Sequence, residues 1–184
     1  KTVFVSDYER KKNEVTNEEY LNTKLRLGNN KTRYSDINIT GLENDFSELR
    51  LSYKLLIQNY YREIGCKIFI NMSIDKSLGN ATIDVESRKY GKKFNHKFSR
   101  NYETRLAIQE GYTVQKIPEK ATFDAGQFGF EISYELVEGE LVQHKNLYVN
   151  TLHLKPENFD KWNEFIQLLI KSYKKNIVLI KSDK

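Results

Sequence analysis

Alternation of apolar and polar residues recurs along the middle of this 184-residue chain and constrains its fold more than any other feature. Residues 49–57, 66–74 and 128–136 each place an apolar side chain at five successive alternate positions. Residues 94–98 and 102–108 repeat the pattern over a shorter length, with His96 and Thr104 among the aligned positions. A period of two is what a half-buried antiparallel strand requires. Several such strands joined by short polar turns predict a mainly β protein, an antiparallel β-sandwich.

The C-terminal third of the sequence changes period twice. Residues 140–154 predict a long strand whose alternation slips near its middle, which indicates a bulge or a bend. Pro156 suits the first turn of a helix, and an apolar stripe at three- and four-residue spacing then predicts a helix over residues 156–175. Trp162 falls within this stripe, so we expect it in the core. Residues 177–180, "IVLI", predict a final short strand.

The N-terminal residues are more polar than the rest. We interpret residues 1–33 as an arm or connector with one short helix, in which Thr16 and Glu19 form a capping box and Gly28 ends the helix. The predicted division is therefore an arm, 1–33, and a β-sandwich domain, 34–184, that includes the helix 156–175. No signal-peptide pattern is visible in the first residues. Because the sequence begins with Lys1 rather than Met, we interpret it as a piece of a longer protein.

Composition argues against several classes of protein. The single cysteine excludes an intramolecular disulfide and a multi-cysteine zinc site. No apolar run approaches the roughly 18 residues of a membrane span. The net charge is +5, and the densest basic stretch, residues 87–100, is more typical of a solvated strand and turn than of a phosphate-binding patch. We therefore expect neither a membrane span nor a nucleic-acid partner.

No nucleophile and base are marked out for catalysis. Cys66 belongs to an apolar alternating set, which predicts a small buried side chain, and His96 shares a strand face with two phenylalanines. His144 and His153 lie about 30 Å apart if their strand is unbent, too far to share a metal ion. Four aspartates sit near predicted turns without forming a pair: Asp36, Asp45, Asp75 and Asp84. We expect no catalytic residue, metal or cofactor; a glycosidase-like carboxylate pair is the least favoured alternative.

Two short stretches remain as candidate sites. Tyr60 and Tyr61 end a predicted strand, where they could form a platform for a ligand, so the alternative function is a carbohydrate- or peptide-binding module. In "IQEGYTVQKIP", Gly111 supplies a turn and Pro118 ends a strand because it has no N–H to donate. We interpret this second stretch as a structural corner.

The order of motifs over residues 50–181 resembles the C-terminal β-domain of unknown function that follows the catalytic domain in bacterial transglutaminase-like proteins. Arg88 or Arg100 matches an arginine that opens a strand in that family, and "IQEGYTVQKIP" matches its corner, with Gln109 in place of the family's first corner proline. The tail "ENFDKWNEFIQLLIKSYKKNIVLIK" matches the family's helix and closing strand.

The resemblance implies an immunoglobulin- or fibronectin-like sandwich that is a non-catalytic accessory domain. Its partner would be the upstream domain of the same chain, and a protein or glycan could be a further partner. The resemblance also implies a periplasmic or secreted location. The family's catalytic Cys, His and Asp belong to the upstream domain, and none of them can be placed on this chain.

Overall fold

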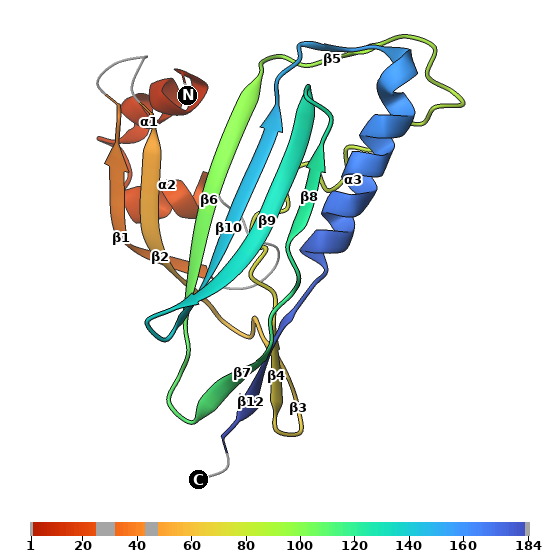
Figure 1. Ribbon diagram of the computed structural model, residues 1–184. Helices are drawn as coiled ribbons and strands as arrows, with labels where there is room; N and C mark the ends of the chain where they lie inside the picture. Colours follow the sequence, from red (N-terminus) through yellow and green to blue (C-terminus); the bar gives the residue numbers. More distant parts are fainter. Residues whose placement is uncertain (1, 25–31, 43–47, 183–184) are drawn as a thin grey trace. The chain divides into compact units, whose positions relative to one another are not determined.

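The computed structural model describes residues 2–24, 32–42 and 48–182 (Figure 1). These residues form two compact units, Lys1–Tyr60 and Tyr61–Lys184. The predicted boundary after residue 33 differs from this division, because the strands that follow it pair within the first unit. The change of hydrophobic period near residue 33 marks a change from helix to strand rather than the start of a domain.

The first unit contains two helices and a two-stranded antiparallel sheet. Its elements are α1 (Thr2–Lys11), α2 (Asn17–Lys24), β1 (Thr32–Thr40) and β2 (Arg50–Ile57). A small core of Tyr20, Leu21 and Tyr34 joins α2 to β1. Helix α1 is not predicted by the sequence, because its first turn is rich in Thr and Val, which have modest helix propensity.

The predicted capping box of α2 is confirmed. The Thr16 N–H donates to Glu19 Oε2 at 2.8 Å, and the Glu19 N–H donates to Thr16 Oγ1 at 3.2 Å. Two otherwise unpaired donors at the helix start are thus satisfied reciprocally. Gly28, predicted to end this helix, lies outside the described residues.

The second unit is mainly β and antiparallel, with one long helix followed by a strand, as the sequence predicts. The first sheet has the order β6 (Phe98–Ala107), β10 (Glu140–Val149), β9 (Phe128–Val137), β8 (Ala121–Asp124). The second has the order β3 (Arg62–Ile64), β4 (Lys67–Ile70), β12 (Ile177–Lys181), β7 (Tyr112–Lys116). A short pair joins β5 (Lys92–Lys93) to β11 (His153–Leu154).

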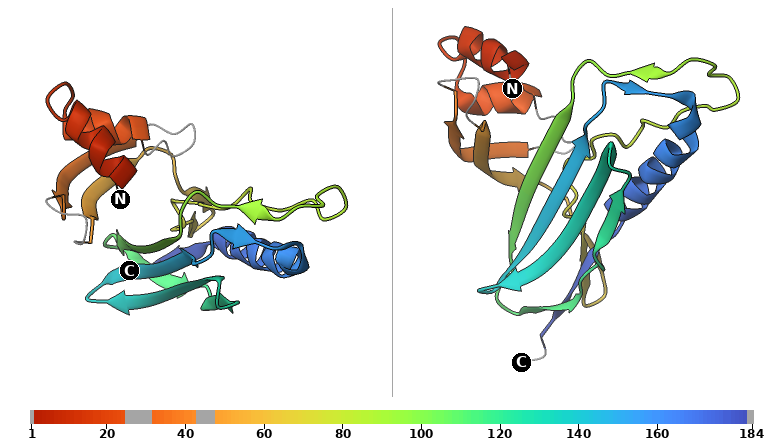
Figure 2. Two further views of the ribbon diagram at one scale, coloured as in Figure 1. Left: turned by 90° about the horizontal axis from the view of Figure 1, so that it is seen from above. Right: turned by 45° about the horizontal axis from the view of Figure 1, so that its top comes forward.

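One face of the first sheet is covered by two different elements. Helix α3 (Phe159–Tyr173), entered through the 3₁₀ turn η1 (Pro156–Asn158), packs on the part that carries Phe128, Phe130 and Leu147 (Figures 1 and 2). The second sheet covers the part that carries Leu141, through Ile177 and Leu179 of β12. Trp162 is fully buried in the helix contact, which confirms the core position predicted for it.

Strand β10 is regular where a bulge was predicted. Its pairing with β6 and β9 runs without a shift from Glu140 to Val149, and the chain leaves the strand only at Asn150. The inward positions are all buried, but two of them are polar, Gln143 and Lys145. The apparent slip in alternation therefore reflects polar residues in the interior rather than an irregular backbone.

Between β4 and β5 the chain runs through residues 71–91 without helix or strand. We call residues 71–83 the strap. Met72, Ser73 and Ile83 of the strap are buried, so its backbone polar groups need partners other than water. The polar residues inside the sheet and on α3 supply several of them.

None of the described helices is both long and apolar enough to span a membrane.

Candidate functional site

The most unusual group in the second unit is the ammonium of Lys145, whose side chain is 2% exposed. It projects from the inner face of β10 toward the strap, where Nζ donates to the backbone oxygen of Asp75 at 2.7 Å and to Asp75 Oδ1 at 3.1 Å. The cation also lies 4.0 Å from the ring centre of Tyr102 and 5.2 Å from that of Tyr173. Both rings favour a cation over their faces.

Strand register and helix periodicity bring these groups together. Tyr102 is the cross-strand partner of Lys145 on β6, so the two side chains share the inner face of the sheet. Tyr173 occupies the last turn of α3 and donates its hydroxyl to the backbone oxygen of Ser77 at 3.0 Å. Arg100, two positions before Tyr102, donates to Ser77 Oγ at 3.1 Å. Three side chains from three elements, Lys145, Tyr173 and Arg100, thus hold residues 75–77 of the strap.

A second polar contact lies further along the same face of β10. Gln143 donates through Nε2 to the Tyr134 hydroxyl at 2.9 Å and to Ser73 Oγ at 3.3 Å. Asn71 donates through Nδ2 to the backbone oxygen of Tyr173 at 2.8 Å. Both inward polar residues of β10 are therefore satisfied by contacts that include the strap.

Helix α3 holds the other end of the strap. The indole N–H of Trp162 donates to the Ala81 oxygen at 2.7 Å. Asn163 accepts from the Ile83 N–H at 2.8 Å and donates to the Ile83 oxygen at 2.7 Å, so one amide satisfies both backbone groups of a buried residue. These side chains replace the ladder bonds that a strand would have made.

Burial and charge pairing shift the pKa values of Lys145 and Asp75 in opposite directions. Burial lowers the pKa of Lys145, while Asp75 acts to raise it. Burial would raise the pKa of Asp75, but hydrogen bonds from Ser77 and the charge of Lys145 outweigh it and leave that pKa lowered. Burial together with Asp75 raises the pKa of Tyr173 and of Tyr102. The lowered pKa of Asp75 keeps its carboxylate ionised at neutral pH, 3.1 Å from the Lys145 nitrogen with which it forms a salt bridge.

This arrangement is suited to holding the strap rather than to attacking a substrate. A lysine nucleophile needs a free amine within reach of its target. The Lys145 ammonium is buried, and its donors are directed to Asp75 and to two aromatic rings. The alternation pattern does not reveal this cluster, although a lysine at an inward position of a regular strand is a usable signal for a buried partner.

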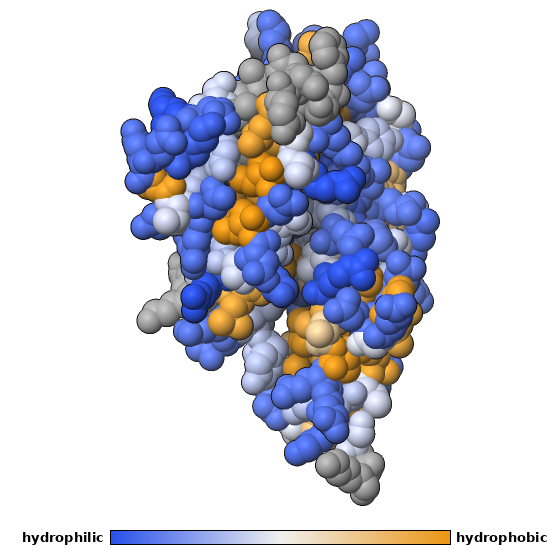
Figure 3. Space-filling model, turned by 90° about the vertical axis from the view of Figure 1, so that its left-hand side faces the viewer, coloured by the Kyte–Doolittle hydropathy of each residue, from blue (hydrophilic) through white to orange (hydrophobic). Residues whose placement is uncertain are grey.

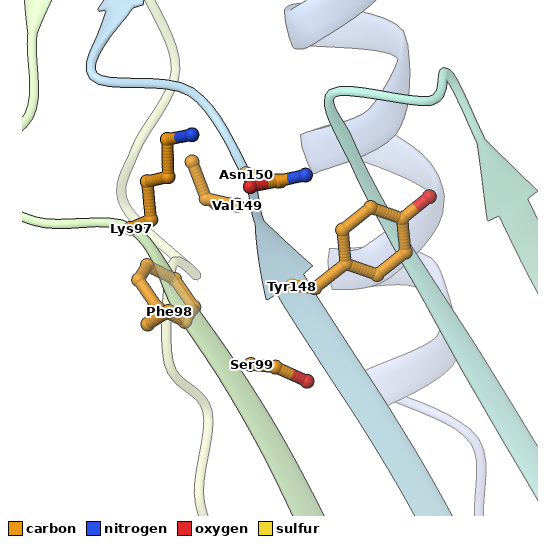
Figure 4. A pocket seen from close by; sticks show the side chains of 6 residues that line it. All are labelled: Lys97, Phe98, Ser99, Tyr148, Val149 and Asn150. Atoms are coloured by element: carbon orange, nitrogen blue, oxygen red, sulfur yellow. The ribbon is translucent and has the colours of Figure 1, made fainter. Parts of the chain in front are cut away.

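The other hollow of interest lies where β6 begins and β10 ends. This open hollow has a volume of about 390 Å³ and is lined by Lys97, Phe98 and Ser99 at the start of β6 and by Tyr148, Val149 and Asn150 at the end of β10 (Figure 4). The Tyr148 hydroxyl donates to Asp124 Oδ1 at 2.6 Å. Burial and this bond raise the pKa of Tyr148 to about 12, so its phenol is neutral at physiological pH.

The predicted tyrosine platform is divided between the two units. Tyr60 is the last residue of the first unit and half-buried, whereas Tyr61 opens the second unit and is 56% exposed. Burial raises the pKa of Tyr60. A ligand site at these two residues stays a prediction.

The predicted corner has the geometry that its sequence requires. Gly111 has φ 84° in the turn between β6 and β7, in the left-handed region that other residues adopt only with strain. Its oxygen accepts from the Ser182 N–H at 2.8 Å. Pro118 is buried two residues beyond the end of β7.

The prediction for Cys66 is wrong. Cys66 is exposed, because it lies with Gly65 in the turn of the β3–β4 hairpin rather than inside a strand. The alternating set continues through Ile68 and Ile70, which pack in the core, but the strand begins only at Lys67. Gly65, with φ 60°, is the turn signal that the alternation concealed.

The histidines do not converge. His96 is exposed between β5 and β6 rather than packed in a strand, and its ring centre lies 6.3 Å from that of Phe98. His144 lies on the outer face of β10, with Nε2 2.8 Å from Glu135 Oε1, and His153 is exposed on β11. Within residues 2–24, 32–42 and 48–182, no three His, Cys, Asp or Glu residues are placed to hold a metal ion.

The aspartates have separate local roles. Asp36 pairs with Lys54 at 2.7 Å across the β1–β2 sheet. Asp84 accepts from Ser87 and from the Glu86 N–H in a turn, and these bonds lower its pKa. Asp45 lies outside the described residues. Of the three that the structure describes, Asp75 is the one joined to a buried cation.

These observations define a mainly β domain whose interior polar groups fix an irregular segment. Residues 66–179 match the family described as "Domain of Unknown Function with solved-structure structure" (DUF3858), so the chain belongs to that family. No curated protein matches the chain.

Among solved structures, the chain is similar to a Parabacteroides distasonis protein described as a "putative protease", with 7% sequence identity and a TM-score of 0.47. The match covers 56% of this chain and 20% of that protein, so the chain spans a small part of its length.

Proposed function

We propose that this chain is a non-catalytic accessory domain that positions or shields a transglutaminase-like domain of the same polypeptide, or mediates contacts with another protein. The observation that carries the proposal is the state of Lys145: the most strongly buried cation of the second unit is used to hold the strap. The order of motifs in the second half of the sequence supports the link to transglutaminase-like proteins. The same proposal includes kinship of the packed sheets with immunoglobulin- or fibronectin-like sandwiches. It also includes a periplasmic or secreted location.

A docking role needs an exposed surface that another domain can cover. Leu136 and Val137 at the end of β9 are 55% and 37% exposed, and Ile64 of β3 is 51% exposed. Ile64 belongs to the second sheet, and Leu136 lies opposite Leu141, which packs against that sheet (Figure 1). Figure 3 shows apolar side chains gathered low on one face of the molecule, above its C-terminal end. Exposed apolar groups of this kind favour contact with a partner.

The test measures, by titration calorimetry, direct binding between this chain and the transglutaminase-like domain proposed to lie upstream. We expect Leu136→Asp and Ile64→Asp to weaken binding at least about tenfold, because each places a charge in the contact. Leu168→Asp is the matched control, since Leu168 is 37% exposed on α3, away from these strands.

Two results would contradict the proposal. One is absence of saturable binding, or equal weakening by the Leu168 control. The other is hydrolase or transferase activity of the isolated chain on peptide substrates, which would assign chemistry to residues interpreted here as structural.

A further inference from the structure

The hollow between the ends of β6 and β10 combines features that the strap cluster lacks: open access, an aromatic ring and free hydrogen-bonding groups. Its volume of about 390 Å³ lies within the usual range for small-molecule sites, roughly 300–1,000 Å³. It is lined by residues from β6, β10 and the adjoining chain, all within the second unit (Figure 4). None of these residues takes part in holding the strap.

Tyr148 is held in place on the outer face of the sheet. Its cross-strand partner is Gly129, and a Cβ added to Gly129 would meet the Tyr148 ring at 2.9 Å and the Phe123 oxygen at 2.4 Å. The glycine therefore makes room for the ring to lie over β9. The bond from the Tyr148 hydroxyl to Asp124 fixes the far end of the ring. A side chain locked in this way is a preorganised surface for a flat, partly apolar ligand.

Polar side chains lie near Tyr148 on the same face of the sheet, on β10 itself and on β6. By register, Ser99 lies opposite Tyr148, and Asn101 lies opposite Asn146 one step further along both strands. All three of these neighbours, Ser99, Asn101 and Asn146, are exposed. Hydroxyl and amide groups beside an aromatic ring match a sugar, which presents C–H groups on one face of its ring and hydroxyls around the edge.

The open end of the hollow adds donors rather than acceptors. The Lys97 ammonium carries a positive charge, and the Asn150 amide can donate two hydrogen bonds. Both side chains are exposed, and the structure gives neither a hydrogen-bond partner among the described residues. A carboxylate on the bound sugar would satisfy both.

We propose that this hollow is a saccharide-binding site for a glycan that contains a uronic acid. The sugar ring stacks on Tyr148, its hydroxyls bond to Ser99 and the neighbouring amides, and its carboxylate pairs with Lys97. The proposal does not rest on the docking role proposed above, because it concerns a different surface and a ligand of another class.

The test measures binding of trigalacturonate and of its neutral counterpart galactotriose to the whole chain, by titration calorimetry and by NMR shifts of backbone amides. We expect trigalacturonate to bind at least tenfold more tightly, with shifts concentrated at the β6 and β10 ends. Tyr148→Leu should weaken binding at least tenfold. Lys97→Gln should remove the preference for the acidic sugar and leave the weak binding of the neutral one.

Matched controls separate the site from general effects of charge and aromatic surface. Tyr90→Leu removes a tyrosine that is 84% exposed elsewhere in the unit. Lys120→Gln removes an exposed cation that lies just before β8 and pairs with Glu131 at 2.9 Å. Neither should change binding by more than about twofold. Tyr148→Phe keeps the ring, so it should retain most of the affinity even if Tyr148→Leu proves unstable.

Three outcomes would overturn the proposal: no saturable binding of trigalacturonate, equal binding of galactotriose, or loss of binding in the Tyr90 or Lys120 control. Binding of inorganic phosphate that displaces trigalacturonate as effectively as excess sugar would also count against it, since the site would then recognise an anion alone.

Discussion

At the scale of single residues, the attachment of the strap depends on whether the contacts of the Lys145 ammonium offset the free-energy cost of burying it. Removing an ammonium from water costs several kcal/mol, and a salt bridge offsets this only when its remaining donors are also paired. Here the donors are directed to a backbone oxygen, a carboxylate and two aromatic faces. The cluster therefore resembles a satisfied network, in which loss of one member is expected to cost more than replacement of the whole.

Replacement of Lys145 tests this directly. We expect Lys145→Met to lower the free energy of unfolding by about 2 kcal/mol, since the apolar chain fills the space but leaves Asp75 unpaired. Asp75→Asn should cost about 3 kcal/mol, because it leaves a buried cation without its counter-ion. The double variant should cost less than the sum of the two, by at least about 1 kcal/mol.

Urea unfolding followed by the fluorescence of the single tryptophan, Trp162, measures these changes. Lys120→Met is the control, because its pair with Glu131 is half exposed and should contribute less than about 0.5 kcal/mol. Additive effects of the two cluster variants would show that Lys145 and Asp75 are not energetically coupled.

Acid pH acts on the same pair through Asp75. Its pKa is lowered in the folded state, so the native state binds fewer protons than the unfolded state. The stability it contributes is present above the unfolded pKa of about 4 and is lost as pH falls through the folded value. We expect Asp75→Asn to flatten the loss of stability below about pH 4, measured by urea unfolding at several pH values, whereas Glu110→Gln in the exposed β6–β7 turn should leave it unchanged.

At the scale of elements, the strap shows what the sequence could and could not predict. Strict alternation in residues 128–136 predicted β9, and the apolar stripe predicted α3, because each pattern repeats on one buried face. The alternation of β4 continues through Met72 to Ile74, but the strap forms no strand there, because its buried residues are fixed by side chains from β10 and α3 that lie far away in sequence. Local patterns cannot reveal such contacts.

The same limit explains why the sequence did not predict the candidate sites. The lysine at an inward position of β10 was read as a slip in alternation, and Cys66 was placed on a strand one residue before that strand begins. The hollow beside Tyr148 depends on strand register, which sets Gly129 and Ser99 as its neighbours. Register is a tertiary property, so that site became visible only in the structure.

Asn163 provides the sharpest test of the strap's attachment to α3. We expect Asn163→Ala to lower the free energy of unfolding by about 1–3 kcal/mol, because both backbone groups of buried Ile83 lose their partner. Amide hydrogen exchange at Ile83 should accelerate more than exchange in β9. Asn158→Ala is the control on the same helix, since Asn158 makes no side-chain capping bond. Unchanged exchange at Ile83 would contradict the role given to Asn163.

At the scale of the whole molecule, buried tyrosines outweigh Lys145 in setting the behaviour at high pH. Burial raises the pKa of tyrosines in both units, among them Tyr34, Tyr134 and Tyr173. Because the pKa of these tyrosines is raised in the folded state, the stability that they contribute is present below the unfolded pKa of about 10 and is lost as the pH rises beyond it. Lys145 acts in the opposite sense, because its lowered pKa relieves an unfavourable charge as pH rises.

We therefore expect the free energy of unfolding to fall above about pH 10, with tyrosinate absorption appearing together with unfolding. Tyr173→Phe should make this fall less steep while costing about 1 kcal/mol at neutral pH through loss of its bond to Ser77. Tyr90→Phe, at an exposed position, should alter neither quantity. Tyrosinate absorption that rises fully before unfolding would refute the expected coupling.

Strand β12 comes late in the sequence but lies in the interior of its sheet, between β4 and β7. During synthesis, β4 and β7 leave the ribosome before β12, the strand that pairs with both of them. The apolar side chains of Ile68, Ile70 and Val114 therefore stay without the neighbours of their core cluster until residues 177–181 have been made. A nascent chain of this kind completes its second sheet only after residues 177–181 have left the ribosome. We expect the fold to be sensitive to removal of residues 177–181, because this five-residue strand joins β4 to β7.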